Sequence, residues 1–328
     1  MIELAECPGC AGQVFHEVYA YNDLVYRPEA AARAIATSAF SACSACGLFF
    51  ARRRQDRDSV AEFYTNFAQF ENRHYAVYPP PASYVRGKEK RAAQICAGLS
   101  ERGLLRSGLD VLHIRCDGGI LLARLREGWN VSGLFGLDYF DSNIRYATEV
   151  LRLPHVAKLD GRCLIPFAHR FDMIISNHML THALEPGPFL ATLRALLKPG
   201  GVVFFYNEND HEVLLDTKRE LLAGGINAFH KQLLTSVSLA NLLGRAGLAF
   251  EAIQRHGAWL EVLTTRATAA ASTPSGDASE IARLHAMFTL WAKRHQRQRT
   301  RRRLPRLLSR WPGARRLKRL FAGLTGRG

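Results

Sequence analysis

From residue 108 onward, short apolar runs alternate with amphipathic stretches of helical period, and this alternation limits the fold more than any other feature. Strands are predicted at 109–114, 130–138, 170–177 and 202–208, and helices at 119–128, 142–151, 188–201 and 234–247. Strands that alternate with helices of about 10 to 15 residues form a parallel sheet covered by helices on both faces. The sequence therefore predicts a doubly wound α/β fold, whose ligand belongs at the carboxyl ends of the strands.

Two apolar runs at 248–256 and 258–266 follow the last of these helices and predict an antiparallel hairpin at one edge of the sheet. Upstream, the prolines of YPPPASY favour an extended passage, and a helix is predicted from 88 to 102. The apolar face of that helix carries Ala92, Ile95, Cys96 and Leu99.

Four of the seven cysteines form two CxxC pairs, Cys7 with Cys10 and Cys43 with Cys46. In a zinc ribbon each such turn directs two thiolates at one tetrahedral Zn²⁺, so the pairs predict a structural zinc site. The 32 residues between the pairs exceed the common spacing, and this segment is expected to loop out. Disulfides, which a reducing cytosol disfavours, and coincidence are the alternatives. Four protein ligands close the coordination shell, so no chemistry is expected of the metal.

The net charge of +15 resides in the C-terminal tail. Of the 44 Lys and Arg residues, 15 lie between 281 and 328, a stretch without Asp or Glu, and the other 29 match the 29 acidic residues. The body of the chain is therefore neutral, and any acidic partner is expected to bind the tail.

Apolar residues in the tail segment 301–324 follow the i, i+3, i+4, i+7 spacing of a helix face in two stripes, divided by Pro312 and Gly313. The stripes are Leu304, Leu307, Leu308 and Trp311, then Leu317, Leu320, Phe321 and Leu324. Arginines with such a face are typical of a helix that lies on an anionic membrane. The second alternative is that this segment docks on its own domain or on a second copy of the chain in a homodimer. Binding to nucleic acid ranks third, because phosphate binding needs no apolar stripe.

The predicted domains are a zinc ribbon with a looped-out insert (1–54), a helical lead-in (55–107), the α/β domain (108–266), a linker (267–280) and a basic amphipathic tail (281–328). No apolar run reaches the roughly 18 residues that span a bilayer. The acidic start MIELAECPGC does not resemble a secretory signal. The expected location is the cytoplasm, including the inner face of a membrane.

Four segments in this order resemble the class I S-adenosylmethionine-dependent methyltransferases over residues 83–265. They are LDVLHIRCDGGILLARL, GLDYFDSNIRYA, the long segment from LDGRCLIPFAHRFDMIISN to LKPGGVVFF, and HKQLLTSVSLANLLGRAGL. A zinc ribbon ahead of such a domain further resembles a subset that includes sugar and natural-product C-methyltransferases. The resemblance implies S-adenosylmethionine as cofactor and a small-molecule, sugar or lipid-linked glycan acceptor.

The resemblance also assigns cofactor contacts. Asp138 corresponds to the carboxylate that accepts both ribose hydroxyls, and it lies nine residues before the alanine of the following helix, Ala147. Asp160 corresponds to the carboxylate that accepts from the adenine amino group, although a turn or cap carboxylate is the alternative. Asn177 is expected beside the methionine portion.

The first cofactor loop departs from the family pattern of an acid followed by glycines at every second position. Here these positions hold His113, Arg115, Asp117 and Gly119. Glycine serves there because the turn needs positive φ and the cofactor approaches the backbone closely. Arg115 is a candidate for the cofactor's carboxylate, and Asp117 for its ammonium group. Two hypotheses follow, a rewired active enzyme and a non-catalytic binding protein that has lost its cofactor.

Histidines after the strand that ends at Asn177 are candidates for a general base, because an acceptor hydroxyl or carbon acid needs one near neutral pKa. His182 is preferred and His178 is second; a packed histidine is the alternative for both. Two histidines four apart also occur in metal sites, but the sequence shows no third ligand. His211 and His230 lie in the segment expected to cap the acceptor pocket.

Overall fold

The computed structural model of the chain describes residues 2–21, 38–60, 62, 77–159, 170–216, 230–257, 259–267, 278–290 and 293. Two sequence predictions, Asp160 on the adenine side and the amphipathic segment 301–324, lie outside these residues.

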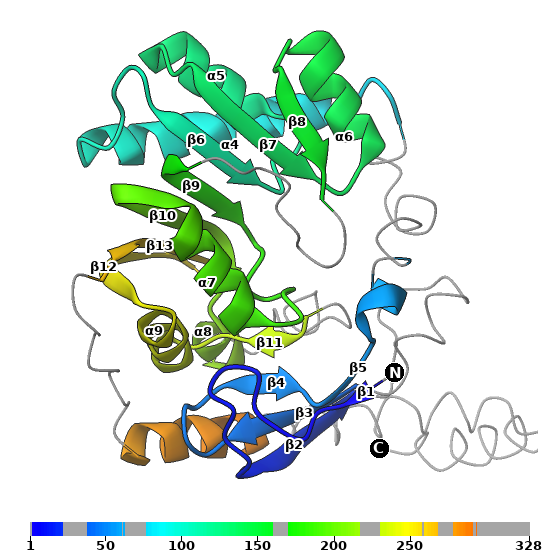
Figure 1. Cartoon of the computed structure of the whole chain (residues 1–328). Helices are drawn as coiled ribbons and strands as arrows, with labels where there is room; N and C mark the ends of the chain where they lie inside the picture. The colour runs from blue at the N-terminus through cyan, green and yellow to red at the C-terminus, as the bar shows by residue number, and fades with distance from the viewer. Residues whose placement is uncertain are drawn as a thin grey trace, which may run out of the picture.

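A seven-stranded sheet forms the centre of the α/β domain (Figure 1). Its strands are β6 (Asp110–Ile114), β7 (Gly133–Asp138), β8 (His155–Lys158), β9 (Phe171–Asn177), β10 (Leu197–Asn209), β12 (Leu248–His256) and β13 (Trp259–Arg266). Their order is β12-β13-β10-β9-β6-β7-β8. Strands β8, β7, β6, β9 and β10 are parallel, whereas β13 runs antiparallel to both β10 and β12. The doubly wound sheet and its late edge hairpin are confirmed.

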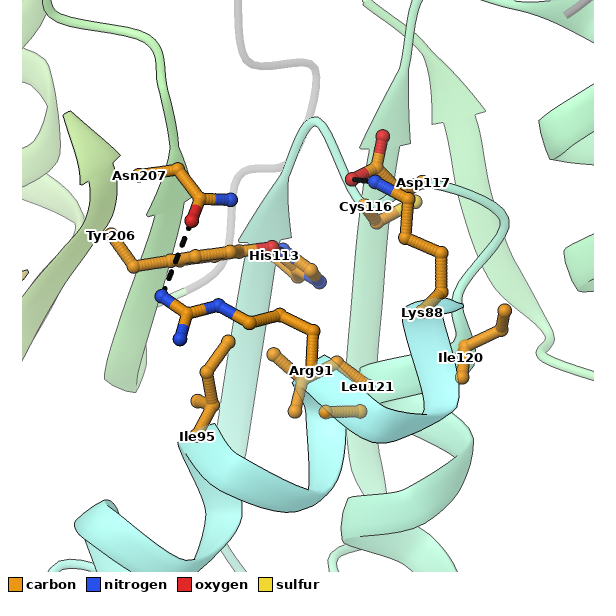
Figure 2. Close-up of a pocket in the computed structure, with 11 residues that line it drawn as sticks. Lys88, Arg91, Ile95, His113, Cys116, Asp117, Ile120, Leu121, Tyr206 and Asn207 are labelled. Carbon is orange, nitrogen blue, oxygen red and sulfur yellow. Dashed lines mark hydrogen bonds and ion pairs between the residues drawn. The ribbon is translucent and has the colours of Figure 1, made fainter. Parts of the chain in front are cut away.

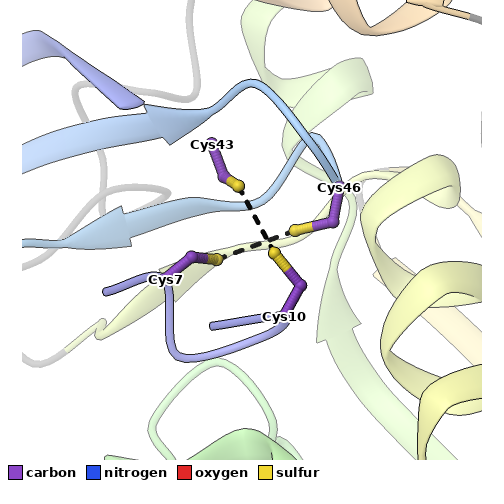
Figure 3. Close-up of side chains that lie close together, drawn as sticks. All are labelled: Cys7, Cys10, Cys43 and Cys46. Carbon is purple, nitrogen blue, oxygen red and sulfur yellow. Dashed lines mark hydrogen bonds between the residues drawn. The ribbon is translucent and has the colours of Figure 1, made fainter. Parts of the chain in front are cut away.

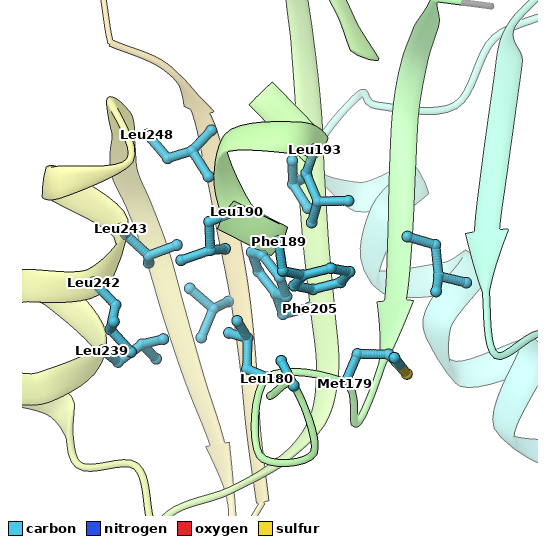
Figure 4. Close-up of a cluster of buried hydrophobic side chains, with 14 of the residues drawn as sticks. Met179, Leu180, Phe189, Leu190, Leu193, Phe205, Leu239, Leu242, Leu243 and Leu248 are labelled. Carbon is cyan, nitrogen blue, oxygen red and sulfur yellow. The ribbon is translucent and has the colours of Figure 1, made fainter. Parts of the chain in front are cut away.

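Helices cover both faces of this sheet because successive strand residues point to opposite sides. On β10, Val202, Phe204 and Tyr206 pack in the cluster under α4 (Ala82–Glu101) and α5 (Ile120–Trp129). Val203 and Phe205 belong to the other cluster, under α7 (Pro186–Leu196) and α9 (Ser236–Arg245). Figure 4 shows this second cluster between α7, α9 and the sheet. The predicted buried face of α4, from Ala92 to Leu99, is confirmed.

Some element boundaries differ from the predictions. The helix predicted at 142–151 is divided into α6 (Asp141–Arg145) and a π-helical turn, η1 (Tyr146–Val150). Helix α7 ends at Leu196, and the Pro-Gly-Gly run lies in the irregular start of β10, where the register with β9 shifts. Strand β8 was not predicted, because its four residues are only half-buried and lack an apolar run.

The N-terminal segment forms two small sheets. One pairs β1 (Ile2–Glu3) with β5 (Arg53–Arg54), and the other has the order β11-β4-β3-β2. Strands β2 (Phe15–Tyr21) and β3 (Ser38–Cys43) form an antiparallel hairpin, and β4 (Phe49–Ala51) follows. Strand β11 (Gln232–Leu233), which lies between α8 (His211–Asp216) and α9, pairs with β4. The ribbon is thus joined to the methyltransferase-like domain by backbone hydrogen bonds.

A further helix, residues 278–290, packs on this ribbon. The ring of Phe288 is buried and stacks on Phe49 with their centroids 4.5 Å apart. Ile281 and Leu284 are buried on the same face. The start of the predicted tail therefore docks on its own chain, and the helix begins three residues before the predicted boundary. Among the residues that the structure describes, no helix is long and apolar enough to cross a membrane.

Candidate cofactor and acceptor site

The loop between β6 and α5 keeps a backbone that glycine normally adopts, although two of its residues are not glycine. Arg115 has a φ of 60° and Asp117 a φ of 51°, and Gly118 and Gly119 follow at 82° and 80°. A residue with a Cβ atom is disfavoured in this left-handed region by about 1–2 kcal/mol. The loop therefore keeps the left-handed conformation at both substituted positions, and other interactions must stabilise it there.

Asp138 supplies one of these interactions from the end of β7. Its side chain is buried, and it accepts hydrogen bonds from the backbone N–H of Asp117 at 2.8 Å, the N–H of Phe140 at 3.0 Å and the amide of Asn143 at 3.0 Å. Burial, followed by the nearby Asp117 carboxylate, raises the pKa of Asp138 to about 6. The residue predicted to bind ribose hydroxyls thus also holds the loop, a role that the sequence did not reveal.

Asp117 is the centre of a polar chain across the carboxyl ends of β6, β9 and β10. Its carboxylate accepts from Lys88 of α4 at 2.6 Å and from the amide of Asn177 at 2.7 Å. Asn177 also donates to the Arg115 carbonyl and accepts from Asn207. Burial opposes ionisation of Asp117, but the charges of Lys88 and Arg115 lower its pKa. Asp117 is therefore an anion at neutral pH, as its predicted contact with an ammonium group requires.

A pocket lies between α4 and this loop (Figure 2). It is lined by Lys88, Arg91, Ala92, Ile95, His113, Cys116, Asp117, Ile120, Leu121, Tyr206 and Asn207. Its walls present the carboxylate of Asp117 and the cations Lys88 and Arg91, which match the opposite charges of an aminoacyl group. This lining fits the amino-acid end of S-adenosylmethionine. Lys88 and Arg91 were missed, although they continue the buried α4 stripe by one turn towards its N-terminus.

The other loop residues predicted to bind cofactor lie in or beside this pocket. His113 is buried and shares a hydrogen bond of 3.0 Å with the Tyr206 hydroxyl; burial lowers its pKa to about 4. A neutral His113 therefore stands where the family has an acid. The Arg115 guanidinium donates to the His178 carbonyl at 3.5 Å, so it extends across the loop towards β9. Gly119 packs against Ala147 and Leu153 with no room for a Cβ atom.

Three histidines converge beyond the ends of β9 and β10. Ring centroids of His178 and His182 are 4.8 Å apart, and His230 lies 5.1 Å from His182 and 5.5 Å from His178. His178 donates from Nδ1 to the Asn207 carbonyl at 2.6 Å, which leaves Nε2 as the proton acceptor of the neutral ring. The two predicted histidines do meet, although their segment forms a turn and not a helix.

His230 is the third potential metal ligand, which could not be identified from the sequence. The three imidazoles offer nitrogen atoms within 4.8 Å of one another, and His230 comes from a distant segment that spacing rules do not reach. Burial, then Arg115, lowers the pKa of His178 to about 3. Burial, then the neighbouring His178 and His230 and, to a smaller extent, the charges of Arg115 and Lys231, lowers the pKa of His182 well below its usual value. These rings are neutral at pH 7. Two cations nearby disfavour a divalent metal at this position.

The four ribbon cysteines form a second cluster (Figure 3). The sulfur atoms of Cys7 and Cys46 are 3.7 Å apart and those of Cys10 and Cys43 are 3.5 Å apart. In a tetrahedral zinc site with Zn–S bonds of about 2.3 Å, sulfur atoms lie about 3.8 Å apart. Backbone N–H groups of Gly9 and Gly12 donate to the sulfurs of Cys7 and Cys10. The cluster fits a zinc ion.

Residues 87–253 match the family model described as a methyltransferase domain, which covers more than half of the chain and runs from α4 to β12. The chain belongs to this methyltransferase family. Its match to the family model includes the loop, Asp138 and the histidines of the β9 turn. The alignment to the family therefore falls on the elements that carry the pocket.

Curated relatives of the methyltransferase are similar over part of their length. The ubiquinone biosynthesis O-methyltransferase of Caulobacter vibrioides is 33% identical over 105 residues, 30% of this chain and 40% of that protein. The same enzyme of Acinetobacter baylyi is 29% identical over 157 residues, 43% of this chain and 64% of that protein. The chain thus spans less than two thirds of either relative. Magnesium protoporphyrin IX methyltransferase of Synechocystis PCC 6803, solved with SAH, is 17% identical with a TM-score of 0.45, covering 64% of this chain and 98% of that one.

Proposed function

We propose that the protein is an active S-adenosylmethionine-dependent methyltransferase whose acceptor is a small molecule, a sugar or a lipid-linked glycan. The observation that carries the proposal is the left-handed backbone at Arg115 and Asp117, held by Asp138 and Asn177. A loop without a ligand has no reason to keep two strained residues in the conformation that glycine adopts in the family. When bound, S-adenosylmethionine supplies an electrophilic methyl group.

Side chains of the protein would position the cofactor and accept the acceptor's proton. Asp117 is proposed to contact the ammonium group of the cofactor, and Lys88 and Arg91 are proposed to contact the carboxylate of the cofactor. These contacts would hold the methyl donor in place for an in-line displacement. His182 is proposed as the general base and His178 as a second candidate, because both rings are neutral and only partly buried beside the loop, although their lowered pKa values make them weaker bases than a free imidazole. His230 packs against both rings and orients them.

Replacement of the histidines tests the base. Transfer of labelled methyl groups from S-adenosylmethionine to a panel of catechols, sugars and nucleotide sugars identifies an acceptor. His182→Gln should then lower kcat by about 10²- to 10⁴-fold, the usual contribution of a general base, and leave cofactor affinity unchanged. The exposed His256, on β12, gives His256→Gln as the matched control. Full turnover in the His182 variant removes it from the mechanism.

The second candidate function is a non-catalytic binding protein with the same fold. The observation in its favour is that Asp117 already accepts from both Lys88 and Asn177, so its carboxylate is satisfied without a ligand. A folded protein that binds neither S-adenosylmethionine nor S-adenosylhomocysteine would establish this alternative.

We also propose that the four cysteines hold a structural Zn²⁺ and that residues 301–324 bind an anionic membrane surface. Metal analysis should find one zinc per chain, and Cys10→Ser should release it. Full-length protein should pellet with anionic vesicles and a chain ending near Thr300, which keeps the docked helix 278–290, should not; equal behaviour of the two defeats the membrane proposal.

A further inference from the structure

Two buried cations lie where the ribbon meets the methyltransferase domain. Arg54, at the end of β5, is 3% exposed, and its Nε and Nη1 atoms have no hydrogen-bond partner among the described residues. Lys231, beside β11, is 4% exposed, and its ammonium group donates to the Gln55 side-chain oxygen, a neutral acceptor. Neither cation forms an ion pair with a residue in the described part of the chain. A buried cation without an anion is unfavourable, so this pair requires an explanation.

The two charges act on each other. Burial and the repulsion of Arg54 lower the pKa of Lys231 to about 7. Burial lowers the pKa of Arg54 to about 10, and the charge of Glu185 opposes this shift only in part. The Glu185 carboxylate already forms an ion pair with Arg57. The described structure therefore contains no carboxylate that neutralises the pair.

The backbone fixes this pair beside the histidine cluster. The Lys231 N–H donates to the Thr181 carbonyl, one residue before His182, and the Lys231 carbonyl accepts from Ala51 of β4. Lys231 also follows His230 directly, and its charge lowers the pKa of His182. Lys231 is therefore adjacent to the histidine cluster along the backbone, so an anion bound at this pair would border the histidine cluster.

We propose that Arg54 and Lys231 bind the phosphate or diphosphate group of the acceptor, which places its reacting carbon or hydroxyl near His182. This inference rests on the proposed methyltransferase function and specifies its substrate class. Two cations call for a dianion, which favours phosphate over a single carboxylate. The same group occurs in a soluble sugar phosphate and in a lipid-linked phosphate, so the test includes both.

The experiment titrates inorganic pyrophosphate into the zinc-loaded full-length protein by calorimetry, just below neutral pH. Arg54→Met and Lys231→Met should each weaken pyrophosphate binding about 10- to 100-fold, as loss of a charged hydrogen bond does. Arg53→Met is the matched control, since Arg53 is its exposed neighbour on β5 and pairs with Glu3. A second arm replaces pyrophosphate with phosphatidylcholine vesicles that contain phosphatidic acid.

A second readout separates binding from a structural role. Without anion, both Met variants should melt at or above the temperature of the wild type, because an unpaired buried charge is removed. Pyrophosphate should raise the melting temperature of the wild type and of the Arg53→Met control, but not that of Arg54→Met or Lys231→Met. Unaltered anion affinity in both variants, or no binding in either arm, would overturn the proposal. Binding in the vesicle arm supports it with a lipid-linked acceptor only where Arg54→Met and Lys231→Met weaken that binding, because the tail is itself proposed to bind anionic vesicles.

Parallel titration with S-adenosylmethionine keeps the two proposals distinct. If the cofactor binds and neither pyrophosphate nor the vesicles bind in a way that depends on Arg54 and Lys231, the anion site falls and the methyltransferase proposal stands. If pyrophosphate binds, Arg54→Met and Lys231→Met weaken its binding, and the cofactor does not bind, then the anion site stands and the methyltransferase proposal falls.

Discussion

Substitution of Gly119 by alanine tests whether the loop is built as tightly as its contacts indicate. Gly119 has a φ of 80°, where an alanine is disfavoured by about 1–2 kcal/mol. A Cβ atom there would lie 2.5 Å from Cδ1 of Leu153 and 3.1 Å from Cβ of Ala147. Both neighbours are buried, so the overlap adds about 1–3 kcal/mol, as overpacking does. The expected loss in the free energy of unfolding is roughly 2–5 kcal/mol.

Gly118→Ala is the matched control. Its φ of 82° is nearly the same, but its Cβ atom would meet Cδ1 of Tyr146 at 3.4 Å, an ordinary contact. The control should therefore lose about 1–2 kcal/mol, the backbone contribution alone. Urea unfolding of both variants and of the wild type measures the difference. Equal losses in the two variants would refute the argument that Ala147 and Leu153 leave no room for a Cβ atom at Gly119.

Four further perturbations are predicted from individual residues. Arg115→Gly should be more stable than Arg115→Ala by about 1 kcal/mol in urea unfolding, because only glycine relieves the left-handed φ. Because the pKa of Lys231 is lowered in the folded protein, the unfolded chain binds more protons than the folded chain between pH 7 and 10.5. The free energy of unfolding should therefore rise with pH in this range, by up to about 1.4 kcal/mol per pH unit from this residue. Lys231→Met should lack this contribution. Chelation of zinc should speed hydrogen exchange in β3 and β4 before it affects β6. Phe288→Ala should expose the helix at 278–290 to proteolysis and leave cofactor affinity unchanged, because it removes the stack on Phe49.

The sequence predicted the sheet because its strands and helices have strong periodicity. The run 109–114 became β6 and the late runs became the β12–β13 hairpin, each within two residues. Strand β8 lacked that pattern. Strand β11 is two residues long and exists only because β4 pairs with it, so no local signal marks it.

The sequence predicted those site residues that match the family pattern at the ends of strands. It did not predict the contacts between segments that are distant in the sequence. The cysteines converge as their spacing predicted. Asp138 lies at the end of β7 as expected, but its bond to the Asp117 N–H depends on loop conformation. His230 reaches His182 from the segment just before β11, and Lys231 bonds to Gln55, the neighbour of Arg54, where the ribbon meets the domain. These contacts arise from tertiary packing, which residue spacing does not encode.

The central claim is that the loop with Arg115 and Asp117 still binds S-adenosylmethionine. Calorimetric titration of the zinc-loaded protein with S-adenosylmethionine and S-adenosylhomocysteine, alongside Asp138→Asn, tests it most directly. Micromolar binding to the wild type, lost in a variant that remains folded, is the predicted result. No binding to a folded wild type would contradict the claim and leave the non-catalytic protein as the explanation.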